Sequence, residues 1–268
     1  MNEPLIIILV VILLIVVFKY SSYKKNIVDG IRYKFNKWKK TAKVISNNYS
    51  GDIVVPSTVS YSGDEKTYLV TRIHYKAFRN CCDLTSIVIP DSVTKFPPTA
   101  FKGCSSLSYI KVESRNTQYD SRNNCNAVIE TGIDELRAGC KNTIIPEGVK
   151  SIGMGAFAYC TGLTSVIIPE GTVGINDSAF FSCSDLTTVA IPRSLKRIGK
   201  GAFLLCESLA DVYCYAEKPP HTIKESILVP FDGSHTKKHT TLHVPAASIE
   251  RYKATPLWSE FKAIVPIE

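Results

Sequence analysis

The segment AFAYCTGLTSVIIP, residues 156–169, decides the fold of this chain because its pattern returns at a fixed interval. The same pattern starts again 23 residues later, at Ala179-Phe180. In each unit a Cys follows the Phe by three residues, and a Leu follows the Cys by three. A constant period of this size is typical of repeat proteins. The Ala-Phe pairs lie at residues 77–78, 100–101, 156–157, 179–180 and 202–203.

The repeated unit reads AFxxCxxLxxIxIPxxVxxIGxx, and each fixed letter has a reason in packing. Alternating apolar residues that end in Pro, as in LTSVIIP, predict a short strand. A solenoid stacks like residues on like, so the Phe residues should form a column, and Ala and Cys should fill places where only small side chains fit. The repeat therefore predicts a mainly β solenoid with inert, buried cysteines at the repeat positions.

The period breaks between Phe101 and Ala156, which predicts a degenerate double unit with an insertion. The segment NCNAVIE, residues 124–130, followed by TGIDELRAG, residues 131–139, reads as a strand, a turn and a strand. We expect this insertion to project from the solenoid, either as a tolerated loop or as a recognition element. A disulfide between Cys125 and Cys140 could close it in an oxidising compartment.

The N-terminus carries a separate signal, the uninterrupted apolar run PLIIILVVILLIVVF of residues 4–18. As a helix it would cover about 22 Å of the roughly 30 Å hydrocarbon core, so a membrane anchor and a cleaved signal peptide are both open. The flanks MNEP and FKYSSYKK lack the basic start and the small-residue cleavage site of a signal peptide. They favour an uncleaved membrane helix within residues 1–20, with a cleaved signal peptide and a buried core segment as the alternatives.

The net charge of +8 belongs to the segment that follows this run. Residues 44–268 contain 23 basic and 22 acidic groups, so the folded part gives no indication of a nucleic-acid partner. Basic residues beside an apolar segment are typical of a membrane-surface patch. The expected cluster is Lys19, Lys24, Lys25, Arg32, Lys34, Lys37, Lys39, Lys40 and Lys43.

Residues 21–47 are expected to form a basic amphipathic segment next to the membrane. Apolar residues recur every three or four positions from Ile27 to Ile45, which predicts a helix that lies on the bilayer or packs on the first repeat. The alternation of Ile31, Tyr33 and Phe35 with basic residues leaves a strand open.

Groups for catalysis or metal binding are sparse. His235, His239 and His243 would share one face of a helix, but their Thr-rich surroundings favour a solvated hairpin. No Gly-rich phosphate loop occurs, and no His has a recognisable motif around it. We therefore expect no enzyme, no metal and no cofactor, with a metal-dependent enzyme built on the three histidines as a distant alternative.

The outward positions of the predicted strands form the candidate ligand-binding face. Strand alternation points the residues between the core positions toward solvent. Tyrosines, small hydroxyls and few charges suit a protein or glycan ligand better than nucleic acid, although a merely solvated face has the same composition. One row holds Ser86, Tyr109, Ser165, Thr188 and Asp211, and the other holds Val88, Lys111, Ile167, Ala190 and Tyr213.

The repeat stops after residue 217, and residues 218–268 are expected to cap the array. A Pro-rich link leads to TLHVP, residues 241–245, and to SIERYKATPLWSEFKAI, residues 248–264. A solenoid needs its last hydrophobic coil covered. A final strand and a short helix carrying Tyr252, Trp258 and Phe261 would do so.

Several segments together resemble the BspA-like leucine-rich-repeat family of bacterial envelope proteins. They are the repeat unit, the insertion YDSRNNCNAVIET at residues 119–131, and the C-terminal region from EKPPH to SEFKAI. The resemblance covers roughly residues 48–268. It implies a right-handed leucine-rich-repeat solenoid over residues 48–217, attachment to host proteins, matrix or other cells, and no enzyme.

Two functions share this solenoid. The first is a membrane-tethered recognition or adhesion module outside the cytoplasm, which the resemblance favours. The second is a cytoplasmic-side scaffold for another membrane protein, which the basic residues after the apolar run would favour by the positive-inside rule.

Overall fold

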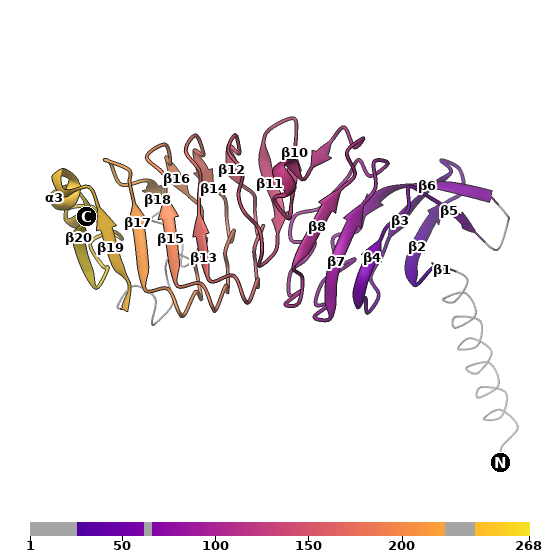
Figure 1. Ribbon diagram of the computed structural model, residues 1–268, viewed down its shortest axis with the longest axis horizontal. Coiled ribbons are helices and arrows are strands. Elements are labelled where there is room, and N and C mark those ends of the chain that lie inside the picture. Colours follow the sequence, from indigo (N-terminus) through magenta and orange to yellow (C-terminus); the bar gives the residue numbers. More distant parts are fainter. Residues whose placement is uncertain (1–25, 62–65, 223–238) are drawn as a thin grey trace, which may run out of the picture.

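The computed structural model describes residues 26–61, 66–222 and 239–268. These residues form an elongated array of strands with the short helix α3 (Ile249–Lys253) at the C-terminal end, which confirms the mainly β fold (Figure 1). The apolar run 4–18 lies outside the described residues. Within them, no helix has the length and apolar character needed to cross a membrane.

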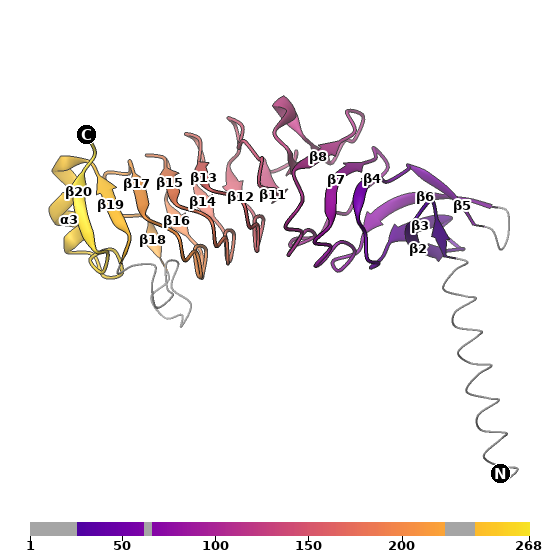
Figure 2. The same cartoon turned by 60° about the horizontal axis from the view of Figure 1, so that its bottom comes forward.

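Each regular repeat unit forms one coil, and its LxxIxI and VxxIG segments become the two strands of that coil (Figures 1 and 2). The strands of successive coils pair in parallel, so one long side of the C-terminal half is a five-stranded sheet. Its strands are β13 (Ser165–Ile167), β15 (Thr188–Ile191), β17 (Asp211–Cys214), β19 (Thr241–Val244) and β20 (Ala263–Pro266). The shorter strands are β12 (Ser151–Ile152), β14 (Gly174–Ile175), β16 (Arg197–Ile198) and β18 (His221–Thr222).

The Phe residues of the C-terminal coils form the predicted column. The ring of Phe180 is stacked between Phe157 and Phe203, with centroid distances of 4.9 and 5.0 Å and interplanar angles of 6° and 3°. All three side chains are buried. Stacking of identical rings in successive coils therefore defines the register of the array.

The repeat cysteines fit into narrow spaces in the core, and they also donate hydrogen bonds. The Sγ–H of Cys183 donates to the carbonyl oxygen of Phe157 at 3.1 Å, and Cys206 donates to Phe180 at 3.1 Å. Each buried thiol thus satisfies a carbonyl group of the preceding coil. Burial raises the pKa of Cys104 and Cys160 to about 12, so these thiols stay protonated and inert.

The N-terminal half contains two further sheets. One is three-stranded and consists of β4 (Gly51–Val54), β7 (Leu84–Ile89) and β8 (Tyr109–Val112) in parallel. The other is five-stranded, in the order β1-β2-β3-β6-β5. Its strands are β1 (Ile27–Val28), β2 (Ile31–Asn36), β3 (Thr41–Val44), β5 (Thr58–Tyr61) and β6 (Lys66–Ile73).

The amphipathic helix predicted between Ile27 and Ile45 is wrong. Strands β2 and β3 form an antiparallel hairpin, and β3 pairs in parallel with β6. Alternation explains the outcome, because Ile31 and Tyr33 are buried while Lys34 between Tyr33 and Phe35 is exposed. The segment adds strands to an existing sheet and so belongs to the folded domain.

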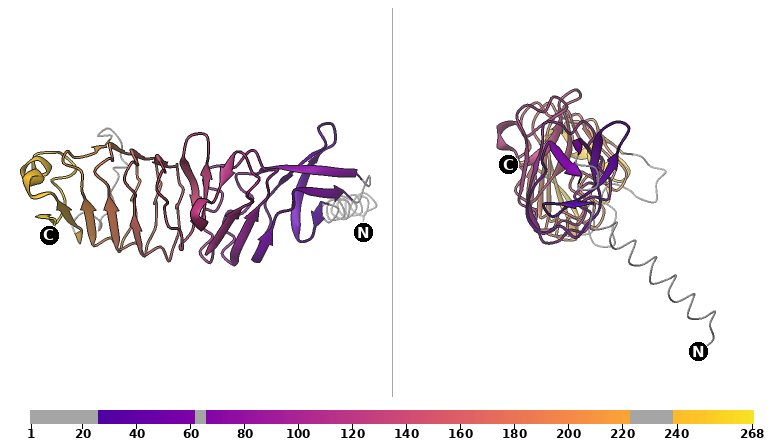
Figure 3. Two further views of the ribbon diagram at one scale, coloured as in Figure 1. Left: turned by 45° about the horizontal axis from the view of Figure 1, so that its top comes forward. Right: turned by 90° about the vertical axis from the view of Figure 1, so that its right-hand side faces the viewer.

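The insertion is a strand, a turn and a strand as predicted, but it does not project from the array. Strands β10 (Ala127–Glu130) and β11 (Glu135–Gly139) form an antiparallel hairpin that lies between the two halves, and β11 also pairs with β12 (Figure 3). Val128 and Ala138 pack into the N-terminal core, and Leu136 packs into the C-terminal core. The hairpin is therefore a wall with a hydrophobic core on each side.

Cys125 and Cys140 lie on opposite sides of this wall. Cys125 belongs to the C-terminal core and Cys140 to the N-terminal core, and both thiols are free. The disulfide considered from the sequence is thus not formed in the structure.

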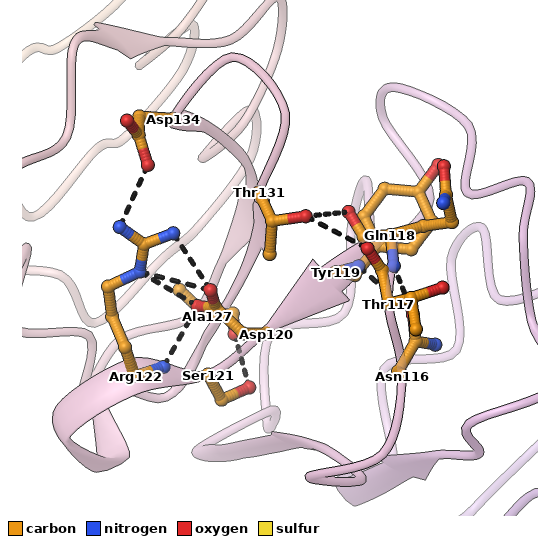
Figure 4. A network of polar contacts seen from close by, with 10 residues as sticks. All are labelled: Asn116, Thr117, Gln118, Tyr119, Asp120, Ser121, Arg122, Ala127, Thr131 and Asp134. Carbon is orange, nitrogen blue, oxygen red and sulfur yellow. Dashed lines mark hydrogen bonds and ion pairs between the residues drawn. The ribbon is translucent and has the colours of Figure 1, made fainter.

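Polar contacts hold the start of the insertion in place (Figure 4). The Nδ2 of buried Asn116 donates to the carbonyl oxygens of Pro90 at 2.9 Å and Val93 at 3.0 Å, which ties the insertion to the preceding coil. Arg122 in η1 (Arg122–Asn124) forms ion pairs of 2.8 Å with Asp120 and with Asp134. Asp120 belongs to β9 (Tyr119–Asp120), which pairs with β10. The insertion is thereby a fixed part of the fold.

The C-terminal end is closed by β19, β20, η2 (Ala246–Ser248) and α3. Tyr252, Trp258 and Phe261 are buried there. The Tyr252 hydroxyl donates to the carbonyl oxygen of Ala216 at 2.8 Å, and Trp258 Nε1 donates to that of Pro220 at 3.2 Å. These contacts cover the last coil.

Candidate interaction face

The outward residues of the C-terminal sheet stand in the two rows expected from the repeat. Strand pairing aligns Ser165 with Thr188 and Thr188 with Asp211. In the second row, Ile167 pairs with Ala190 and Ala190 pairs with Tyr213. None of the predicted members of this row is buried. Beyond the prediction, β19 and β20 extend both rows. The residues that the sequence missed are Thr241, His243, Ala263 and Val265.

The N-terminal members of the rows lie on a different sheet. Ser86 pairs with Tyr109, and Val88 pairs with Lys111, on β7 and β8. Strand β4 adds Asp52 and Val54, which precede the first complete repeat and so lacked the repeat signal. Because β8 and β13 belong to separate sheets, the predicted rows are divided into two patches. We call them the N-terminal patch (outward residues of β4, β7 and β8) and the C-terminal patch (outward residues of β13, β15, β17, β19 and β20).

Both patches expose apolar side chains. Ile167 is 76% exposed in the C-terminal patch, and Val54 and Tyr109 are 65% and 43% exposed in the N-terminal patch. Exposed aliphatic and aromatic groups among small hydroxyls are the composition expected of a protein-binding surface. The patches are therefore the candidate interaction face.

The C-terminal patch contains a cluster of three functional groups. The Nε2 of His243 lies 2.7 Å from Oδ1 of Asp211, and its ring stacks on Tyr213 with a centroid distance of 4.2 Å and an angle of 12°. His243 thus belongs to this face. The sequence could not predict the register of its strand, because the repeat ends before β19. His235 lies outside the described residues, within which no three His, Cys, Asp or Glu side chains gather to hold a metal.

The N-terminal patch carries a carboxylate instead. Asp52 accepts hydrogen bonds from the hydroxyls of Ser86 at 2.6 Å and Thr85 at 2.7 Å. These two bonds lower the pKa of Asp52, since they favour the ionised form. The patch therefore presents a fixed negative charge on β4, in the same row as Ser86 and Tyr109.

The predicted basic cluster is only partly described. Lys19, Lys24 and Lys25 lie outside the described residues. The remaining members are distributed over the β2–β3 hairpin, on β2, its turn and β3. They are Arg32, Lys34, Lys37, Lys39, Lys40 and Lys43.

Comparison with known proteins is consistent with this architecture. The chain matches the BspA type leucine rich repeat region in six copies, over residues 67–131 and 137–239. No curated protein matches the chain. Its fold resembles that of a leucine-rich repeat protein from Eubacterium ventriosum, with 19% identity and a TM-score of 0.53 over 81% of this chain and 55% of that one.

Two further solved structures are similar to the chain. A leucine-rich repeat protein from Bacteroides ovatus has 22% identity and a TM-score of 0.48, over 90% of this chain and 55% of its own. The leucine-rich repeat protein of T. pallidum has 26% identity and a TM-score of 0.37, over 68% of each chain. The chain spans about half the length of the first two. The repeat match covers more than half of the sequence, and the chain therefore belongs to the BspA-type leucine-rich repeat family.

Proposed function

We propose that this chain is a non-catalytic recognition module that binds another protein through the interaction face. The observation that carries the proposal is the alignment of solvent-facing side chains across coils, with exposed Ile167 and half-buried Tyr213 and His243 on one sheet. A flat parallel sheet holds such groups rigidly, so little conformational entropy is lost when a partner covers them. Aromatic residues in such a position are frequent hot spots of binding energy.

The proposal includes a membrane tether formed by the apolar run of residues 4–18 and a position outside the cytoplasm. The family resemblance supports that side, since it points to envelope proteins. The alternative is a scaffold on the cytoplasmic side, supported by the lysines that follow the apolar run. Protease treatment of intact cells separates the two. A protease outside the cell can digest the repeats only if they lie outside, whereas repeats inside the cytoplasm are protected.

Site-specific photo-crosslinking in the full chain tests the binding face. A benzophenone amino acid at Ile167 should give a discrete crosslinked product in cells that make the protein. The same probe at Met154, which is 52% exposed on the segment after β12, is the control and should not. Equal products from both positions would contradict a specific face.

Variants then separate recognition from folding. Tyr109→Ala and Tyr213→Ala remove partly exposed rings, so both should leave the thermal midpoint nearly unchanged. We expect the crosslinked yield to fall about tenfold or more if either ring is a hot spot of roughly 1.4 kcal/mol or above. An unchanged yield in both variants would remove the face from consideration.

A further inference from the structure

Four basic side chains line up across neighbouring strands at the N-terminal end of the array. Lys34 on β2 pairs with Lys43 on β3, and Lys43 pairs with Arg72 on β6. An isolated bridge then pairs Arg72 with Lys95. Adjacent strands lie about 4.8 Å apart, so this cationic row extends over about 14 Å. We call Lys34, Lys43, Arg72 and Lys95 the cationic row.

The cationic row opposes the stability of the fold. Like charges directly opposite each other on a sheet repel. In the described part of the chain, no carboxylate forms an ion pair with any of the four side chains. The pKa of His74 nearby is lowered by burial and then by Lys43, Lys76 and Lys34, which reflects the same positive field. Such an arrangement suits a function that needs an anion.

Three members of the row, Lys34, Lys43 and Arg72, line a groove; Lys95 is not among its lining residues, whereas Lys37 and Lys39 are. A pocket of 670 Å³ is lined by Lys34, Lys43 and Arg72, together with Phe35 and Trp38. Trp38 is 98% exposed at the turn of the β2–β3 hairpin, so packing among the described residues does not explain it. A groove that combines cations with an exposed indole can bind a charged ligand that also has a flat apolar surface.

We propose that the cationic row binds a linear acidic polysaccharide, with one carboxylate on each of several successive sugars. The row extends over about 14 Å, the length of about three sugars in an extended chain. Because successive sugars turn their carboxylates to different sides, the long, flexible lysine side chains must reach around the chain to meet them. The indole of Trp38 would stack on the apolar face of a sugar ring. This proposal does not depend on the interaction face, because the row belongs to a separate sheet.

Two other polyanions fit less well. A bilayer presents its phosphates over a plane, whereas five basic residues line a groove here together with Trp38. They are Lys34, Lys37, Lys39, Lys43 and Arg72. In extended single-stranded nucleic acid the phosphates are farther apart than one strand spacing, and several aromatic residues normally stack on the bases. The groove has one fully exposed aromatic ring.

Binding of polygalacturonate to the full chain in a neutral detergent tests the proposal, with fully methyl-esterified polygalacturonate as the uncharged match. We expect binding only to the charged polymer. The logarithm of affinity should fall with the logarithm of salt concentration with a slope of about −3, if four contacts release counterions as phosphate contacts do. Equal binding of the esterified polymer would overturn the proposal.

Charge variants identify the residues. In Lys34→Gln/Lys43→Gln/Arg72→Gln/Lys95→Gln, affinity should fall at least tenfold and the thermal midpoint should stay equal or rise, because repulsion is removed. The control Lys150→Gln/Lys196→Gln/Lys200→Gln/Lys218→Gln removes the same number of charges elsewhere and should retain at least half of the affinity. Unchanged binding by the first variant, or equal losses in both, contradicts the role of the row.

A single substitution tests the same groove with a variant that is not expected to misfold. Trp38→Ala changes a side chain that is almost fully exposed, so the fold should persist while affinity falls several-fold. Oligo(dT) and mixed micelles containing phosphatidylglycerol serve as competing polyanions. If oligo(dT) or the micelles displaced polygalacturonate from the native chain at a lower concentration of negative charges than polygalacturonate itself needs, the assignment to a polysaccharide would be overturned.

Discussion

Gly139 stands where the Phe column stops, and its replacement by Ala tests why it stops there. The Gly139 amide donates to the carbonyl of Ala156 at 2.9 Å, as the Phe157 amide does to that of Ala179 at 2.7 Å. A Cβ atom added to Gly139 would lie 2.1 Å from Cε1 of Phe157. Carbon atoms in contact prefer about 3.5–4.0 Å, so the ring would have to move by more than an ångström. Phe180 stacks on the same ring at 4.9 Å and restricts that movement.

The expected cost follows from two opposing effects. Overpacking a tight core costs about 1–3 kcal/mol. Replacing Gly by Ala within a strand gains roughly 0.5–1 kcal/mol, because the unfolded chain loses freedom. We therefore expect Gly139→Ala to lower the free energy of unfolding by about 1–2 kcal/mol, which corresponds to a decrease of roughly 2–8 °C in the thermal midpoint.

Urea unfolding followed by circular dichroism measures this cost in two backgrounds. In Phe157→Leu the ring is gone, so adding Gly139→Ala should cost at least about 1 kcal/mol less than it does in the native chain. Gly132→Ala is the control, since a Cβ there meets no atom within 4 Å. Equal costs of Gly139→Ala in both backgrounds would refute the argument that the Phe157 ring excludes a side chain at this position.

Three further predictions follow from packing and titration. Phe180→Ala should lower the free energy of unfolding by about 3–5 kcal/mol in urea, because it empties the middle of the column; a loss below about 1 kcal/mol contradicts this. Of the nine thiols only Cys82 is exposed, so dithiodipyridine should modify one thiol per folded chain rapidly and the others only after denaturation. The lowered pKa of Asp52 stabilises the fold above the ordinary carboxyl pKa and ceases to do so as pH falls through the lowered value. The thermal midpoints of the native chain and Asp52→Asn should therefore differ at neutral pH and converge in acid, and a difference independent of pH would count against this.

The regular part of the fold could be predicted because the repeat encodes its own register. Residues 23 positions apart occupy equivalent places, so Ser165 and Thr188 had to be neighbours once the strands were recognised. The same logic predicted the Phe column. It could not predict that the thiol of Cys183 donates to the carbonyl of Phe157, because a small buried residue is compatible with many hydrogen-bonding patterns.

The irregular segments were harder because their structure depends on contacts distant in sequence. The spacing from Ile27 to Ile45 fits a helix, yet the segment is a hairpin of β2 and β3 that pairs with β6. Strand alternation was present in the same residues, and only the neighbouring strand decides between the two. His243 likewise joined the candidate face through pairing of β19 with β17, although it lies 30 positions after its partner Tyr213 in the sequence.

The wall formed by β10 and β11 has a consequence for how such a protein can change in length. One hairpin completes the core of the N-terminal half and begins that of the C-terminal half. The residues at this boundary contact the same neighbours however many coils lie farther along. Duplication or loss of a whole coil can therefore lengthen or shorten either half by itself, and the length of each patch becomes adjustable without rebuilding the centre.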